Sequence, residues 1–227
     1  ALAEARAIYD GLLAHADAPR HVRAAALRGA ILMRDGDQDM SLLTDALRGG
    51  DADDFGTALR AARELEAREQ TADTLAALLP ALPDDRKVRV MEVLGMLGGA
   101  AAGKAALAEA RQGPIEVRKA ALAALTQMGY RPGLELMMEL CWTEDGDLAK
   151  AARSALSYFP GGEGDDAVLT LLRHAQPLAR LAAVEMIGQG ALEKPAGVLM
   201  PIAKGDKNKD VRMAALRALQ ESAGLDE

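Results

Sequence analysis

The stretch GGAAAGKAAL (residues 98–107) contains most of a phosphate-binding loop pattern. Gly98, Gly103 and Lys104 have the GxxxxGK spacing, in which backbone N–H groups and the lysine bind phosphate oxygens. The pattern also requires a strand before the loop and a hydroxyl residue after the lysine to bind Mg²⁺, but this chain has Ala105. The repeat described below places the stretch between two helices. We therefore interpret it as a glycine-terminated helix end and predict no nucleotide binding.

Two acidic stretches, DGDQD (35–39) and DKNKD (206–210), begin like calcium-binding loops with oxygen ligands at positions 1, 3 and 5. Such a loop also needs Gly at position 6 and Glu at position 12. The first stretch has Met40 and Ala46 there, and the second also lacks both residues. Both stretches are predicted to be turns whose acidic side chains cap the following helix. We predict no metal site and no cofactor.

The remaining residues with catalytic chemistry have no workable spacing. No histidine belongs to an HExxH pattern or a His-Glu pair, and no serine lies in a GxSxG setting (His15, His21 and His174; Ser41, Ser154, Ser157 and Ser222). Cys141, beside Trp142, could be a reactive thiol, but a buried small residue is the commoner state of a single cysteine. The sequence therefore predicts a protein that is not an enzyme.

The composition favours helices and disfavours nucleic acid as a partner. Half of the 227 residues are hydrophobic and only 3% are aromatic, with Ala and Leu prominent, which is typical of helical proteins. A net charge of −7 opposes binding to phosphate backbones. No apolar run approaches the roughly 20 residues of a membrane helix, so no membrane contact is predicted. The single cysteine excludes an intramolecular disulfide and leaves the compartment open.

The elements that must position any site are repeats. VRAAALRGA begins at Val22, VRKAALAAL at Val117 and VRMAALRAL at Val211, and weaker copies fill the gaps. The copies are 31 or 32 residues apart, and they predict helices that begin near residues 22, 54, 86, 117, 148, 179 and 211. Below, a repeat position is the number of residues after the start of its copy.

The same repeat positions carry the same kind of residue. Position 4 is alanine in six of the seven copies and position 8 is mostly larger, which predicts a helix packed closely against its neighbours. Second apolar stretches of helical period lie between the copies, and turn clusters rich in Gly, Pro and Asp close them. We therefore predict an all-α chain of about seven helical hairpins that forms one domain, residues 1–227.

The unit DKNKDVRMAALRAL (206–219) closely resembles HEAT-like repeats, and the resemblance covers essentially the whole chain. It implies a right-handed α-solenoid of antiparallel hairpins, with the first helices on the convex side and the second helices on the concave side. It also implies that an arginine at position 1 bonds to a turn aspartate of a neighbouring unit. Four copies keep this arginine (Arg23, Arg118, Arg180 and Arg212), and three copies depart from it (Phe55, Lys87 and Ala149).

The N-terminal run AEARAIYDGLLAHADAPRHVRAAALRGA resembles the opening of HEAT segments in larger secreted bacterial proteins. The last stretch, SAGLDE, has no distinctly polar extra helix to cap a stack of repeats. We therefore expect a segment of a larger bacterial protein, in the cytoplasm or the periplasm. We expect it to be a monomer.

The concave face, by this resemblance, carries positions 2 and 6, which are mixed in charge, partly apolar and free of aromatic residues. Such a surface suits a protein partner or a neighbouring domain of the same chain better than nucleic acid. The predicted function is a non-catalytic interaction or spacer module, and its predicted partner-binding residues are Arg28, Arg60, Lys119, Lys150, Leu181, Glu185 and Arg217. The alternatives are a HEAT-like lyase or DNA glycosylase, which needs a deep pocket, and a purely structural linker.

Overall fold

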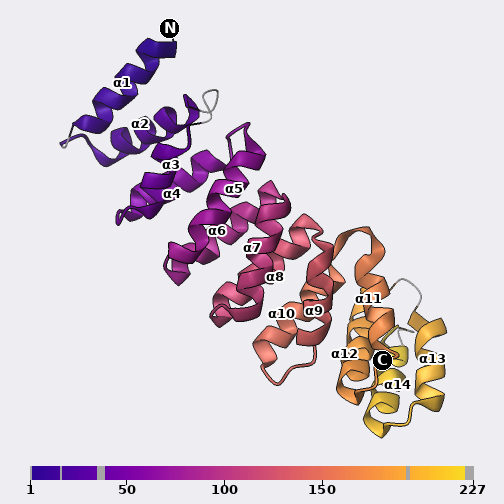
Figure 1. Cartoon of the computed structure of the whole chain (residues 1–227). Coiled ribbons are helices and arrows are strands. Elements are labelled where there is room, and N and C mark those ends of the chain that lie inside the picture. Colours follow the sequence, from indigo (N-terminus) through magenta and orange to yellow (C-terminus); the bar gives the residue numbers. More distant parts are fainter. Residues whose placement is uncertain (1, 16, 35–38, 193–194, 223–227) are drawn as a thin grey trace. The chain divides into compact units, whose positions relative to one another are not determined.

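The computed structural model describes residues 2–15, 17–34, 39–192 and 195–222, which form fourteen α-helices and no β-strand (Figure 1). The predicted all-α class is therefore confirmed. The helices are α1 (Leu2–Ala14), α2 (Arg20–Leu32), α3 (Ser41–Arg48), α4 (Ala52–Ala62), α5 (Arg68–Leu78), α6 (Asp84–Leu97), α7 (Ala100–Gln112), α8 (Ile115–Met128), α9 (Leu134–Leu140), α10 (Gly146–Ser157), α11 (Glu163–Leu171), α12 (Pro177–Met186), α13 (Pro195–Gly205) and α14 (Lys209–Ser222). Short 3₁₀ turns are η2 (Leu79–Ala81), η3 (Arg131–Gly133) and η4 (Pro160–Gly162), and a π turn is η5 (Ile187–Ala191).

The even-numbered helices each begin two residues before a copy of the repeat. Local chemistry explains several of these starts. The side chains of Asp51, Asp145 and Asn208 accept backbone N–H groups at the first turns of α4, α10 and α14. At other starts a proline, which has no N–H to lose, directly precedes the helix (Pro19, Pro83 and Pro114).

The chain divides into two compact units, Ala1–Glu109 and Ala110–Glu227, and the boundary falls within α7. In the first unit α2 packs against α4 and α4 against α6, while α3 packs against α2, α4 and α5, and α5 also packs against α6. In the second unit α8, α10, α12 and α14 pack in succession, and α9, α11 and α13 pack on the helix that follows each of them. Each unit therefore has two layers of helices. The single-domain organisation stays a prediction.

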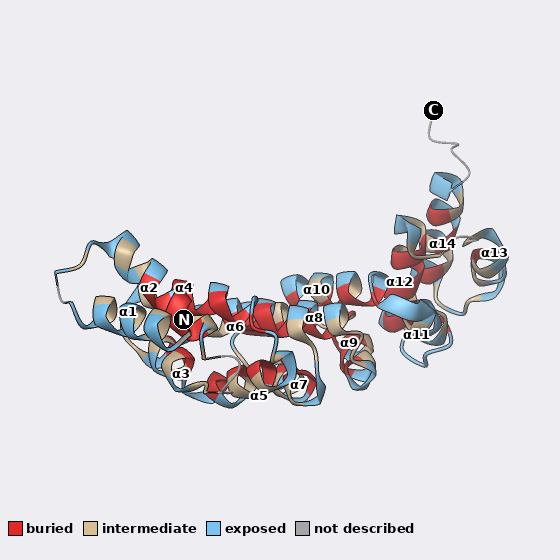
Figure 2. Cartoon of the chain, turned by 90° about the horizontal axis from the view of Figure 1, so that it is seen from above, coloured by how far each residue is buried: buried red, intermediate tan, exposed pale blue. Residues whose placement is uncertain are grey.

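The core of each unit lies where neighbouring helices face one another (Figure 2). All seven residues at repeat position 4 are at most 1% exposed, and these are Ala26, Ala58, Val90, Ala121, Ala152, Ala183 and Ala215. Position 8 is also buried except at the half-buried Leu219. A small residue at position 4 lets the helix backbones approach closely, which explains why alanine recurs there.

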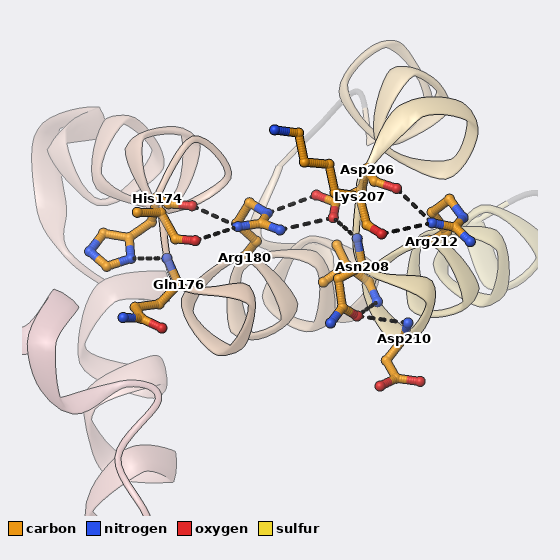
Figure 3. Close-up of polar contacts among 10 residues, drawn as sticks. His174, Gln176, Arg180, Asp206, Lys207, Asn208, Asp210 and Arg212 are labelled. Carbon is orange, nitrogen blue, oxygen red and sulfur yellow. Dashed lines mark hydrogen bonds and ion pairs between the residues drawn. The ribbon is translucent and has the colours of Figure 1, made fainter.

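Two of the four position-1 arginines pair with an aspartate of the next repeat. Only one of these aspartates, Asp206, is a turn residue as the resemblance implies, because Asp54 lies in the first turn of α4. Arg23 of α2 donates to Asp54 of α4 at 3.0 Å. Arg180 of α12 donates through Nε and Nη2 to both carboxylate oxygens of Asp206, at 2.7 and 2.9 Å (Figure 3). The first pair joins α2 to α4, and the second joins α12 to the turn before α14.

Three of the four position-1 arginines bond to backbone carbonyls at the end of the preceding helix or in the turn. Arg118 donates to the carbonyl oxygen of Ala110 at 2.9 Å. Arg180 and Arg212 donate in the same way to pairs of carbonyls in the turns before their helices. Because the last carbonyls of a helix lack intrahelical partners, a cationic donor there satisfies them and complements the helix dipole.

Phe55 replaces the arginine in the second copy, and a residue of the third copy makes the missing bonds. The guanidinium of Arg86 lies 4.5 Å from the centroid of the buried Phe55 ring. It donates to the carbonyls of Leu47, Gly49 and Gly50, at the end of α3 and in the turn before α4. Phe55 cannot donate a hydrogen bond, but its ring attracts the guanidinium of Arg86, which donates instead.

Ala149 replaces the arginine in the fifth copy, and Arg153, one helical turn later, donates to the carbonyl of Cys141 at 2.7 Å. In the third copy Lys87 instead pairs with Glu109 at 2.9 Å, and both of these side chains are 15% exposed. Where the position-1 arginine is missing, other side chains therefore make the bonds between these helices and their neighbours.

We expect Arg86→Met to lower the free energy of unfolding of the first unit by about 2 kcal/mol, because charge-assisted bonds to three carbonyls are lost while the methionine stem still covers Phe55. Urea unfolding followed by circular dichroism measures this change. Arg48→Met, at an exposed arginine of α3, is the matched control and should change stability by less than about 0.5 kcal/mol. Equal effects of the two variants would contradict the capping role of Arg86.

Candidate functional site

A groove of about 500 Å³ lies between α8 and α10 in the second unit. We call it the α8–α10 groove, and its lining residues are Lys119, Ala123, Thr126, Gln127, Ala151, Ser154, Ala155, Tyr158 and Pro160. On α8 these residues occupy repeat positions 2, 6, 9 and 10, which share one helix face. The groove therefore follows from two successive second helices that present the same face.

Short side chains form the floor of this groove. Alanines of both helices line it, and Thr126 donates its hydroxyl to the carbonyls of Leu122 in α8 and Ala155 in α10, at 3.0 and 3.2 Å. Tyr158 is 79% exposed at one end, and Lys119 pairs with Glu116 at 3.1 Å at the rim. An apolar floor with an exposed aromatic ring and a charged rim is typical of surfaces that bind proteins.

The seven predicted binding residues lie in both units. Arg28 and Arg60 belong to the first unit, and the other five belong to the second, so neither unit contains all seven. Lys119 lines the α8–α10 groove, whereas Lys150 is exposed on α10 outside its lining. Leu181 is half-buried on α12, and Arg217 is exposed on α14.

Two of the predicted binding residues already have intramolecular partners. Arg28 pairs with Glu64, and the hydrogen bond between them raises the pKa of the arginine and lowers the pKa of the glutamate. Glu185 accepts from Arg153 at 2.6 Å, which links α12 to α10. These groups are partly exposed, so the pairs stabilise the fold only weakly. A partner that bound either residue would first have to separate an ion pair.

Cys141 is fully buried, and its thiol donates to the carbonyl of Met138 at 3.1 Å. Burial raises the pKa of this thiol to about 12. Since the thiolate is the reactive form, Cys141 is inert at neutral pH. Its neighbour Trp142 contacts the ring of His174, with the ring centroids 5.7 Å apart.

The stretch 98–107 covers the turn between α6 and α7 and the first two turns of α7. α6 ends at Leu97, Gly98 and Gly99 have φ values of 77° and 100°, and α7 begins at Ala100. Lys104 therefore lies in the second turn of a helix, and the element before the stretch is a helix where a phosphate-binding loop has a strand.

In DKNKD (206–210), the side-chain oxygens of Asp206 and Asn208 already accept hydrogen bonds from the protein. Asp206 accepts from Arg180 and from the backbone N–H of Asn208, while the Asn208 side chain accepts from the N–H groups of Asp210 and Val211 (Figure 3). This arrangement is a turn followed by a helix cap. In DGDQD, residues 35–38 lie outside the described residues. Within the described ranges, no group of three or more His, Cys, Asp or Glu side chains could hold a metal ion.

No protein-family model matches the chain, and no curated protein matches it significantly in sequence. Among the described helices, none is both long and apolar enough to span a membrane.

Sequence reasoning missed Tyr158, Thr126 and Ala151 because it considered only positions 2 and 6 of each repeat. Positions 9 and 10 lie one further helical turn along the same face, and position 3 of α10 faces α8 in the groove. Extending the face by one turn would have identified Tyr158, which occupies position 10 of the fifth copy. The prediction of a face free of aromatic residues was therefore incomplete.

Proposed function

We propose that this chain is a non-catalytic HEAT-like repeat module that binds a protein partner through the face formed by its second helices. The single observation that carries the proposal is the α8–α10 groove, with its alanine floor and the exposed ring of Tyr158. Tyrosine is enriched among the few residues that contribute most of the binding energy in protein interfaces.

The solenoid architecture is part of the same proposal. The starts of the even-numbered helices recur every 31 or 32 residues, and within each unit these helices pack in succession on one another. An array of this kind offers extended surfaces, because every repeat adds a copy of the same face.

Charge and chemistry favour a protein partner over the alternatives. The net charge of −7 opposes a nucleic-acid partner, and ion pairs neutralise charged residues of the second-helix face at Arg28 and Glu185. A lyase or glycosylase would need a reactive group in a pocket, and the buried, protonated thiol of Cys141 does not supply one.

A binding experiment tests the groove. We expect the double variant Ser154→Arg and Tyr158→Ala to bind the partner at least about tenfold more weakly, because it fills the floor with a charge and removes the exposed ring. The partner is first captured from an extract of the source cells with the immobilised chain. It is then purified, and its dissociation constant is measured with each variant.

Leu178→Ala is the matched control, because Leu178 is an exposed apolar residue of the same unit outside the groove. Its dissociation constant should remain within about twofold of the unmodified protein. Unchanged affinity of the groove variant, or equal weakening by the control, would contradict the proposed surface.

A further inference from the structure

A second pocket, of about 370 Å³, lies in the first unit among residues of α2, α4 and α6. We call it the arginine pocket, because Arg20, Arg60 and Arg89 line it together with His21, Asp53 and Gly56. Positive charge is concentrated here although the chain as a whole has a net charge of −7. The arginine pocket is therefore a local exception to the acidic character of the chain.

Two of these arginines converge on one point. A methyl group added to Gly56 would lie 3.3 Å from Nη2 of Arg89 and 3.8 Å from Nη1 of Arg60. Gly56 itself is buried, so it forms a floor beneath the two guanidinium groups. Both guanidinium groups are positively charged, so an anion placed between them would be attracted by both.

Both guanidinium groups are held in place by the protein. Nη2 of Arg60 donates to the hydroxyl of Thr57 at 2.9 Å, and Thr57 is only 2% exposed. The guanidinium carbon of Arg89 lies 4.9 Å from the centroid of the buried Phe55 ring. Because these side chains are ordered before binding, they lose less conformational entropy when a ligand binds.

The charges of Arg60 and Arg89 are not balanced within the described residues. Asp53, the carboxylate that lines the pocket, lies 3.7 Å from Arg20. In contrast, Arg23, Arg28 and Arg63 of the same unit each pair with a carboxylate. Arg60 and Arg89 make no ion pair with any carboxylate in the part of the chain that the structure describes. The pocket therefore has two positive charges available for a ligand.

We propose that the arginine pocket binds a phosphate monoester group. Such a group carries a charge of about −1.5 to −2 at neutral pH and has three acceptor oxygens, so it can balance two guanidinium groups at once, whereas a carboxylate balances one. Arginine is suited to this task because its planar fork donates two parallel hydrogen bonds to phosphate oxygens. The inference goes beyond partner binding at the α8–α10 groove and does not depend on it.

Calorimetric titration of the whole chain with inorganic phosphate at low ionic strength tests the site. We expect saturable binding, and we expect Arg60→Gln and Arg89→Gln each to weaken it by about tenfold. Arg48→Gln removes the same charge from an exposed position of the same unit outside the pocket, and it should leave the affinity within about twofold. The absence of binding, or equal weakening by Arg48→Gln, would overturn the proposal.

Gly56→Ala separates a built site from general electrostatic attraction, because it leaves the charge unchanged. Alanine is favoured in a helix, so the variant should fold, and its methyl group would occupy the space where the two guanidinium groups converge. We expect phosphate binding to weaken by at least about threefold. Full affinity in this variant would contradict binding of the phosphate between Arg60 and Arg89.

A phosphoserine peptide distinguishes the sources of the phosphate group. Tighter binding of this peptide than of inorganic phosphate, with no binding of its unphosphorylated form, would support a phosphorylated protein as the ligand. Equal binding of the peptide and inorganic phosphate would support a small phosphate compound.

Discussion

Asp206→Ala is expected to lower the free energy of unfolding of the second unit by about 3 kcal/mol, because it leaves the charge of Arg180 in a mostly buried site without its carboxylate. The two side chains are only 13% and 5% exposed, and two hydrogen bonds of 2.7 and 2.9 Å join them. Asp206 also accepts the backbone N–H of Asn208 at 2.8 Å, so its removal loosens the turn before α14. Urea unfolding followed by the fluorescence of Trp142, the single tryptophan, measures the change in this unit.

Asp210→Ala provides the control for this prediction. Asp210 lies in the same turn region, but it is exposed in the first turn of α14. Its loss should lower the free energy of unfolding by less than about 1 kcal/mol, through the helix dipole. Similar losses from Asp206→Ala and Asp210→Ala would show that the pair with Arg180 does not stabilise the unit.

The pH dependence of stability gives an independent test of the same pair. The hydrogen bond from Arg180 lowers the pKa of Asp206 below its ordinary value of 3.8 in the folded protein. Its contribution to stability is therefore present above the ordinary pKa and is lost as the pH falls through the lower folded pKa. The difference in unfolding free energy between the unmodified protein and Asp206→Asn should be complete above about pH 5 and should shrink below about pH 4. A difference that did not change with pH would contradict this origin.

Gly164→Ala is also expected to destabilise the second unit by about 3 kcal/mol, although alanine is the better helix former. Gly164 lies in the first turn of α11, where an added methyl group would overlap the backbone carbonyl oxygen of Leu156 and lie 3.1 Å from Cβ of Phe159. A backbone atom cannot rotate away as a side chain can. The methyl group therefore has to push α11 away from the end of α10, and the lost packing lowers stability.

Gly197→Ala is the control for Gly164→Ala, because the same substitution is expected to change the free energy of unfolding in the opposite direction. Gly197 lies in α13, and a methyl group added there would meet no atom within 4 Å. This variant should raise the free energy of unfolding by about 0.5 kcal/mol through helix propensity alone. Destabilisation by Gly197→Ala, or a neutral effect of Gly164→Ala, would contradict the role of close helix approach. The same urea experiment measures both variants.

The helix approach at Gly164 also affects the α8–α10 groove. Tyr158 directly follows α10 and lies close in sequence to the contact between Leu156 and Gly164. A shift of α11 would therefore displace the ring that we propose as a binding residue. Gly164→Ala should weaken partner binding as well as stability, whereas Gly197→Ala should weaken neither.

The sequence by itself determined the helical class, the starts of the even-numbered helices and the buried positions 4 and 8 of the repeat. These features depend on local chemistry: periodic apolar residues select a helix face, and Asp51, Asp145 and the prolines set where helices begin. The residues at position 4 are all buried because each copy packs this position closely against a neighbouring helix. Because the pattern recurs every 31 or 32 residues, these local signals can be recognised from the sequence without knowing any distance between atoms.

Only the tertiary structure decided which side chains from different copies meet. In the structure the guanidinium of Arg86 lies on the ring of Phe55 and donates to three carbonyls at the end of α3 and in the turn before α4. These bonds form although Phe55 replaces the arginine at position 1 of the second copy. The tertiary structure also brought Arg60 and Arg89 together above Gly56 and opened the α8–α10 groove beside Tyr158. These meetings join residues about one repeat apart, and they depend on how closely the helices pack and on side-chain direction, which a pattern of residue types does not specify.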